Sequence, residues 1–148
     1  MVISAWTIDL WILNPSNYAS WSIDMEVGTN AANWVTVSAK STNAWLLSAS
    51  TSSTINNLTT DWIAESYKFA SSLWANADSV IAWYTRSANL DVEVNDNTTS
   101  HILYTTNKSE SSTDVDDFTF TVSAKIDAQT PAANDYQDLV NVTVVWNF

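Results

Sequence analysis

The chain has no cysteine, one glycine, one histidine and only five lysine and arginine residues among 148. Without cysteine, disulfide bonds, thiol catalysis and thiolate metal sites are excluded. The sixteen acidic residues give a net charge of −11, so we expect no basic patch that could bind nucleic acid or an anionic membrane. Because glycine is so rare, turns with positive φ are expected to use asparagine and aspartate.

Long apolar runs are also missing, so neither a transmembrane helix nor insertion into a membrane is expected. The N-terminus lacks the basic start and small-residue cleavage site of a signal peptide, so an exported form of this protein would be the mature chain. With 46% hydrophobic residues the chain can bury a core. Its length fits one domain over residues 1–148.

Apolar and polar residues alternate with a period of two along most of the chain. Turn signals such as Asn14-Pro15-Ser16-Asn17 separate about eight short segments of this kind. They lie at residues 6–13, 21–27, 34–39, 44–49, 90–94, 102–104, 118–126 and 140–148. The pattern predicts an all-β fold, a single jelly-roll-like β-sandwich.

The middle of the chain is open to two interpretations. One short helix could begin at Thr60, with Trp62, Tyr67 and Trp74 near one face. Two short strands, at residues 67–70 and 80–84, fit about as well.

Few residues could carry out catalysis. His101 would have to be the base of any Ser-His-Asp triad, and the sequence has no Gly-x-Ser-x-Gly, phosphate-loop or His-Glu-x-x-His motif. A surface histidine is the better interpretation. A glycosidase would need two facing carboxylates, and nothing in the sequence selects such a pair. We therefore expect no enzymatic activity.

Two groups of acidic residues are candidate ligands for Ca²⁺, which takes six to eight oxygen ligands. The first group consists of Asp114, Asp116 and Asp117. The second consists of Asp91, Glu93 and Asp96. Neither group has the EF-hand spacing, and solvated acidic loops explain both, so Ca²⁺ is the one cofactor left open.

Nine tryptophans are present, several times the ordinary number. A row of exposed rings would suit a carbohydrate-binding module, whereas buried rings would form the core. Four tryptophans at alternating apolar positions are predicted to lie in the core: Trp6, Trp21, Trp34 and Trp146. The pattern leaves core, interface and ligand-binding roles open for the other five: Trp11, Trp45, Trp62, Trp74 and Trp83.

Four Asn-x-Ser/Thr sequons mark candidate sites for N-linked glycans. They lie at Asn57, Asn97, Asn107 and Asn141.

The segment Ala5-Trp6-Thr7-Ile8-Asp9-Leu10, followed by Leu13-Asn14-Pro15, resembles the Ala-Gly-Thr-Leu-Asp-Leu segment of TasA/camelysin-type proteins. The stretch Asn134-Asp135-Tyr136-Gln137-Asp138 and the valine-rich segment after it resemble that family's Asn-x-Tyr-Gln-Gly and last strand. Three family glycines are replaced here, by Trp6, Ala44 and Asp138, and the family's acidic motif upstream is absent.

The resemblance implies a β-sandwich that polymerises by donating a strand, as in TasA/camelysin-type proteins and related archaeal bundling-pilus subunits. The residues themselves allow this, because a terminal apolar strand can leave its domain and pair with the sheet edge of the next copy. Repeated head to tail, the contact makes an open filament. The donor candidates lie within residues 1–13: Val2, Ile3, Trp6, Ile8, Leu10 and Ile12. If residues 6–13 stay in their own domain, as the resemblance suggests, the donor shortens to residues 1–5.

The expected function is a secreted, non-catalytic structural subunit of an extracellular filament or pilus, with copies of itself as partners and with possible N-linked glycans. A carbohydrate-binding module with exposed tryptophans is one alternative. A capsid, tail or surface-layer protein is another, with the same sandwich but closed or two-dimensional contacts.

Overall fold

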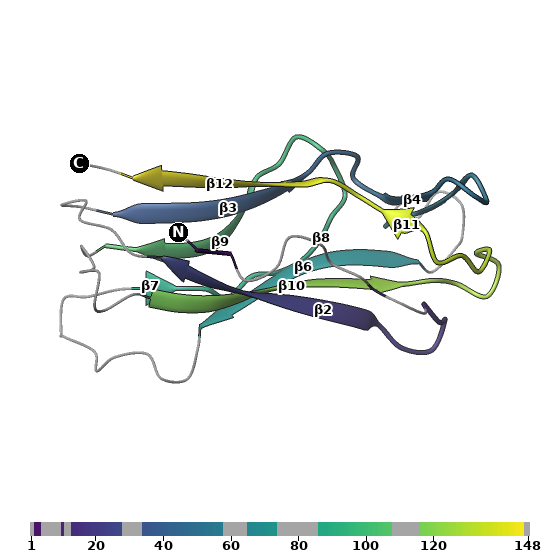
Figure 1. Cartoon of the computed structure of the whole chain (residues 1–148), viewed down its shortest axis with the longest axis horizontal. Helices are drawn as coiled ribbons and strands as arrows, with labels where there is room; N and C mark the ends of the chain where they lie inside the picture. The colour runs from purple at the N-terminus through teal and green to yellow at the C-terminus, as the bar shows by residue number, and fades with distance from the viewer. Residues whose placement is uncertain are drawn as a thin grey trace.

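The computed structural model describes residues 2–3, 10, 13–27, 34–57, 65–73, 86–107 and 116–146, with the backbone alone for residues 2–3 and 116–117. These residues form an all-β sandwich, and the helix-free trace is shown in Figure 1. No helix capable of crossing a membrane occurs within these ranges. The predicted all-β class and sandwich are confirmed.

Sheet A is antiparallel, with the strand order β1-β2-β10-β6-β8. Its strands are β1 (Val2–Ile3), β2 (Ala19–Val27), β10 (Asp116–Lys125), β6 (Ser66–Leu73) and β8 (Asp91–Glu93). The central strand β10 pairs with β2 over nine residues and with β6 over eight.

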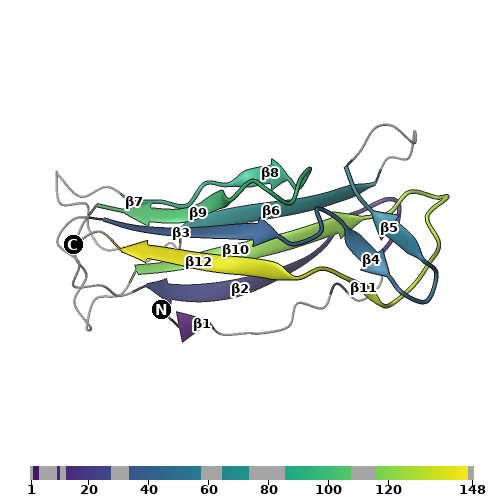
Figure 2. The ribbon, with the colours of Figure 1, turned by 90° about the horizontal axis from the view of Figure 1, so that it is seen from above.

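Sheet B is the facing layer, with the order β12-β3-β9-β7. Its strands are β12 (Val140–Trp146), β3 (Val35–Ser41), β9 (His101–Thr106) and β7 (Arg86–Ser87). A small sheet C covers one end of the sandwich and has the order β11-β4-β5 (Figure 2). Its strands are β11 (Tyr136–Gln137), β4 (Leu46–Ser48) and β5 (Ser53–Ile55). The predicted number of about eight strands was too low, because it missed several strands of two or three residues.

The core lies between sheets A and B and is built by alternation. In β2, the side chains of Ile23, Met25 and Val27 are buried while the residues between them are exposed. The aromatic rings of Phe118 in β10 and Tyr104 in β9 stack across the layers, with centroids 5.0 Å apart. One face of each sheet is therefore apolar and dry, as two packed sheets require.

Phe69 in β6 has the most ring contacts in the described core. Its ring makes edge-to-face contacts with Tyr67 at 5.4 Å, Phe120 at 5.3 Å and His101 at 6.0 Å between centroids. These contacts join β6, β10 and β9, so the same ring ties both layers together.

The predicted helix in the middle of the chain is wrong over residues 66–73, which form strand β6. The side chains of Tyr67, Phe69 and Ser71 are buried at alternating positions, and β6 has a strand on each side. Tertiary pairing has overridden the helical pattern. The alternative strand at 67–70 is confirmed, while Thr60, Trp62, Trp74 and the segment 80–84 lie outside the described residues.

Positive φ occurs at Ala44 (φ 70°) and Ser52 (φ 56°) among the described residues, and not at asparagine or aspartate as expected. At Ala44 the backbone N–H donates to Ser41 Oγ at 2.7 Å. This bond helps to hold alanine in a conformation that glycine would adopt more readily.

Candidate strand-addition interface

The four lateral edges of sheets A and B are the places where another chain could add a strand. An edge strand presents unpaired N–H and C=O groups, and proteins usually protect it with charge, proline, a bulge or short length. In Figure 2, β12 and β2 run along one long side of the sandwich and β7 and β8 along the other.

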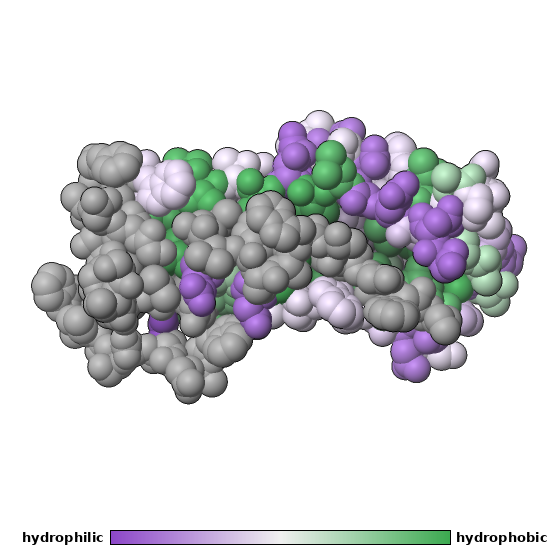
Figure 3. Space-filling model, viewed as in Figure 1, coloured by the Kyte–Doolittle hydropathy of each residue, from purple (hydrophilic) through white to green (hydrophobic). Residues whose placement is uncertain are grey.

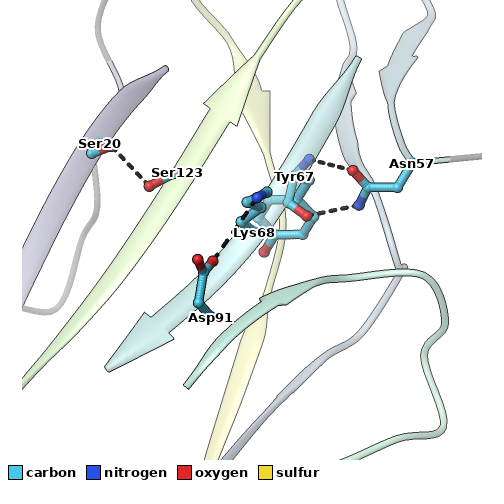
Figure 4. Close-up of polar contacts among 6 residues, drawn as sticks. All are labelled: Ser20, Asn57, Tyr67, Lys68, Asp91 and Ser123. Carbon is cyan, nitrogen blue, oxygen red and sulfur yellow. Dashed lines mark hydrogen bonds and ion pairs between the residues drawn. The ribbon is translucent and has the colours of Figure 1, made fainter. Parts of the chain in front are cut away.

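Three of these edges are protected. Strand β8 has outward carboxylates at Asp91 and Glu93, and the Asp91 carboxylate lies 3.9 Å from Lys68 Nζ (Figure 4). Strand β7 is two residues long and contains Arg86. The β2 edge has two outward carboxylates and is met at one end by β1. Charge and shortness discourage pairing at β8 and β7, whereas β2 already accepts β1 at Met25 and Glu26.

The β12 edge is unprotected. Its sequence, Val-Asn-Val-Thr-Val-Val-Trp, has no charge, no proline and no glycine over seven residues. Within the described part of the chain, β12 pairs with β3 alone, and no described strand pairs with its other side. Apolar residues, green in Figure 3, reach the surface in the upper part of the view, where β12 and β3 lie in Figure 1. By the usual rules for sheet edges, the residues of β12 give it no protection against an added strand, while β2 is the edge to which a strand, β1, is already added.

Polar contacts hold the start of β12 in place. Thr42 N donates to Leu139 O at 2.9 Å, and Asn141 Nδ2 donates to Thr42 Oγ1 at 3.1 Å. The Thr42 carbonyl in turn accepts from Asn97 Nδ2 at 3.3 Å. These hydrogen bonds therefore hold the N-terminal end of β12 in place.

The Asp138 carboxylate joins β12 to both layers. Its Oδ2 accepts from Ser41 Oγ at 2.5 Å and from Tyr67 Oη at 3.0 Å. Its Oδ1 accepts from Asn43 Nδ2 at 3.0 Å and from Leu139 N at 2.8 Å. Ser41 ends β3 in sheet B and Tyr67 belongs to β6 in sheet A, so one side chain links the two sheets.

Tyr67 is fully buried, and its burial, reinforced by the Asp138 charge and hydrogen bond, raises the pKa of its hydroxyl far above the ordinary 10.0. Above pH 10 the unfolded chain loses this proton and the folded protein does not. Stability is therefore expected to fall by about 1.4 kcal/mol per pH unit from this group alone. Urea titrations between pH 8 and 11 would measure the slope. Tyr67→Phe should reduce it by that amount, and an unchanged slope would contradict the assignment.

The donor candidates are only partly described. Val2 and Ile3 form β1, which pairs antiparallel with β2 of the same chain, Val2 opposite Glu26 and Ile3 opposite Met25. Leu10 lies outside any strand and packs, half-buried, against the core. Trp6, Ile8 and Ile12 lie outside the described residues. The strand predicted over residues 6–13 is wrong at Leu10 and Leu13, which lie outside any strand, and the described pairing of this segment is at residues 2–3.

The tryptophans predicted for the core are on the surface wherever the structure describes them. The exposed fractions are 38% for Trp21, 41% for Trp34 and 43% for Trp146, so the core prediction is wrong for all three. Trp21 and Trp146 have the parity of the inward residues of β2 and β12, but their rings are left partly uncovered. Trp34 has the opposite parity to the buried Val35 and Val37, so the alternation places it on the outer face of the sheet. Trp45 is also exposed, at 38%. The other five lie outside the described residues: Trp6, Trp11, Trp62, Trp74 and Trp83.

The candidate Ca²⁺ ligands are not brought together where they are described. The carboxylate of Asp96 accepts from the backbone and hydroxyl groups of Thr98 and Thr99, which lowers its pKa and uses its oxygens within its own turn. Asp91 and Glu93 point to solvent from β8. No group of three potential metal ligands occurs in the described ranges. Asp114 and the side chains of Asp116 and Asp117 lie outside them.

The sequon asparagines differ in their surroundings. Asn57 Nδ2 donates to Tyr67 O at 2.7 Å, and Asn57 Oδ1 accepts from Tyr67 N at 2.9 Å (Figure 4). Asn57 Nδ2 also donates to Val94 O at 3.0 Å. A glycan on Nδ2 would break one of these bonds. Asn97, Asn107 and Asn141 are exposed and therefore more accessible as acceptors, although the Nδ2 atoms of Asn97 and Asn141 each donate one hydrogen bond to Thr42.

His101, the single candidate base, lies at the start of β9 and is partly exposed. Its Nε2 is buried without a hydrogen-bond partner, and its ring packs against Phe69. No described carboxylate or hydroxyl is hydrogen-bonded to Nε2, so these residues supply no triad.

Neither a scan against protein-family models nor searches of curated proteins and of solved structures returned a match. The edges and contacts of this chain must therefore support any functional proposal. The signal that sequence reasoning missed is the uncharged composition of residues 140–146, which is visible in the sequence once that segment is known to be an edge.

Proposed function

We propose that the protein is a structural subunit of an extracellular filament that polymerises by β-strand complementation, with no catalytic step. The observation that carries the proposal is that β1 adds to the edge of sheet A as a separate two-residue strand. The same pairing with β2 of a neighbouring copy would keep its hydrogen bonds and join two subunits.

The length of the connection supports such an exchange. Residues 4–18 lie between β1 and β2 and would span about 50 Å if extended, enough to reach an adjacent subunit. Beyond Met25 and Glu26, the β2 edge has no other strand partner among the described residues, so it offers room for a longer donor. Because the donor and acceptor are different surfaces, the contact repeats head to tail into a filament.

The conformation of Ala44 supports the resemblance to TasA/camelysin-type proteins. Ala44 stands where that family has glycine, and its φ of 70° is one that glycine adopts without cost. By the same resemblance the protein would be secreted and lie on the cell surface. The exposed Asn97, Asn107 and Asn141 would carry its glycans, if the source organism adds them.

A carbohydrate-binding module is the second candidate, favoured by the exposure of Trp21, Trp34, Trp45 and Trp146. Aromatic rings at a surface can stack against sugars, but they are equally suited to protein interfaces. Binding of soluble polysaccharides by a monomer that never polymerises would favour this candidate. A capsid or surface-layer protein would instead give closed or two-dimensional assemblies.

Electron microscopy of negatively stained protein tests the filament directly. The full chain is expected to form filaments, and Ile3→Pro should abolish them, because proline removes the N–H that β1 needs for pairing. Ile3→Val is the matched control and should leave filaments intact. Tryptophan fluorescence would verify that all three proteins are folded.

Folded monomers in all three samples would contradict the proposal. Filaments that survive in Ile3→Pro would move the donor strand away from residues 2–3 and contradict the β1 assignment.

A further inference from the structure

We propose that the open edge of β12 pairs with β12 of a second copy, antiparallel and across a two-fold axis at Thr143. This side-by-side contact is separate from the end-to-end contact proposed above and stands without it. Its occupant is a second copy of this chain, and it would extend sheet B of one copy into sheet B of the other.

The first argument is the contrast among the edges. Strands β8, β7 and β2 have charged residues along or beside their open sides, whereas β12 has none in seven residues. A long uncharged edge without proline pairs readily with another strand. In a stable protein such an edge is normally covered, and nothing within the described residues covers it.

The second argument is charge. The chain has sixteen acidic residues and a net charge of −11, so two copies repel each other at most orientations. The four strands of sheet B contain no aspartate or glutamate, and their charged residues are Lys40 and Arg86. The acidic strand residues lie in sheet A. Two copies can therefore approach through sheet B with the least repulsion.

The third argument is register. An antiparallel β12 pair overlaps fully only when Thr143 faces Thr143 of the second copy, because Thr143 is the middle residue of Val140–Trp146. Val142 then faces Val144, and Val140 faces Trp146, all on the core side of the sheet. Asn141 faces Val145 on the outer side. No like charges meet, and apolar and β-branched pairs of this kind stabilise a sheet.

The inward valines would gain from the contact. Val140, Val142 and Val144 are only partly buried in the isolated chain and pack against its core from the sheet edge. A second strand beside β12 would cover their open side together with part of Trp146, which is 43% exposed. The contact would thus bury apolar surface as well as pair backbone groups.

Cysteine cross-linking tests the register sharply, because the natural chain has no cysteine. Facing Cα atoms in an antiparallel pair lie about 4.5–5.5 Å apart, within the range of roughly 4.4–6.8 Å that a disulfide spans. The full-length variant Thr143→Cys is therefore expected to form a disulfide-linked dimer under mild oxidation. Val145→Cys faces Asn141 instead and should not. Asn95→Cys, exposed beyond β8, measures random collision.

Thr143→Cys should link roughly tenfold faster than Asn95→Cys or more, since pairing raises the local thiol concentration. Linking of Thr143→Cys no faster than Asn95→Cys would overturn the proposal, as would a faster reaction at Val145→Cys. The double variant with Ile3→Pro separates the two contacts. A Thr143→Cys dimer that persists when filaments are lost supports side-by-side pairing on its own. Linking that disappears with the filaments would mean that β12 strands meet only inside filaments formed through β1, and would overturn a separate side-by-side contact.

Discussion

Replacing Phe69 with alanine is expected to lower the free energy of unfolding by about 4 kcal/mol. The side chain is fully buried and contacts the rings of Tyr67, Phe120 and His101. Truncation therefore leaves a cavity between the two sheets and removes three edge-to-face pairs. Urea denaturation followed by tryptophan fluorescence would measure the change, and Tm should fall by roughly ten degrees.

Phe69→Leu is the matched control, because it fills most of the cavity and loses only the ring contacts. Its cost should be well under half that of alanine. Equal costs for the two variants would mean that the ring contacts, and not the cavity, determine stability here. A negligible cost for alanine would contradict the placement of Phe69 in the core.

Replacing Asp138 with alanine is expected to cost about 3 kcal/mol, because it leaves the buried hydroxyls of Tyr67 and Ser41 without their acceptor. The loss would also release the start of β12 from sheet A. We therefore expect faster hydrogen exchange in β12 than in β10. Urea denaturation and amide exchange would measure the two effects.

Two controls accompany this variant. Asp138→Asn keeps an acceptor for Asn43 and Leu139 and should lose about half as much stability. Asp91→Ala removes an exposed carboxylate with one long ion pair and should leave stability unchanged. If Asp138→Ala behaved like Asp91→Ala, Asp138 would not join the two sheets.

Much of the fold could be predicted from alternation. The segments 21–27, 34–39 and 118–126 correspond closely to β2, β3 and β10, because each has one face against the opposite sheet. Short strands such as β7 and β11 could not be predicted, since two residues contain no period. The segment around Tyr67 has both helical and strand periodicity, and only the pairing of β6 with β10 decides between them.

The tryptophans show where alternation fails. Trp21 has the same parity as Ile23 and Met25 and pairs with the buried Val122, yet its ring is exposed because no described strand flanks this part of β2, where β1 pairs only with Met25 and Glu26. A period of two tells which face a residue is on, but not how far the opposite sheet extends. The exposure of such a ring can be predicted only once the arrangement of the strands is known.

The candidate interface was predicted only in part. A terminal strand and an exposed edge follow from the sequence, but which strand is the edge depends on the order of strands in each sheet. Residues 140–146 have the pattern of an ordinary strand, and their edge position is known only because β3 is the one described strand that pairs with β12. The Asp138 contacts could not be foreseen either, because Ser41, Tyr67 and Asp138 meet from three distant segments.

The central place of β10 in sheet A has a consequence for synthesis of the chain. Residues 28–115 separate β2 from β10, so β2 leaves the ribosome long before its main partner exists. Sheet B likewise needs β12, which follows its other three described strands in the sequence. Native structure is therefore expected to form late and collectively, as in other folds with distant strand pairs. This order has a benefit: the uncharged segment of β12 is made after its partner β3, so β3 has already been synthesised when β12 emerges.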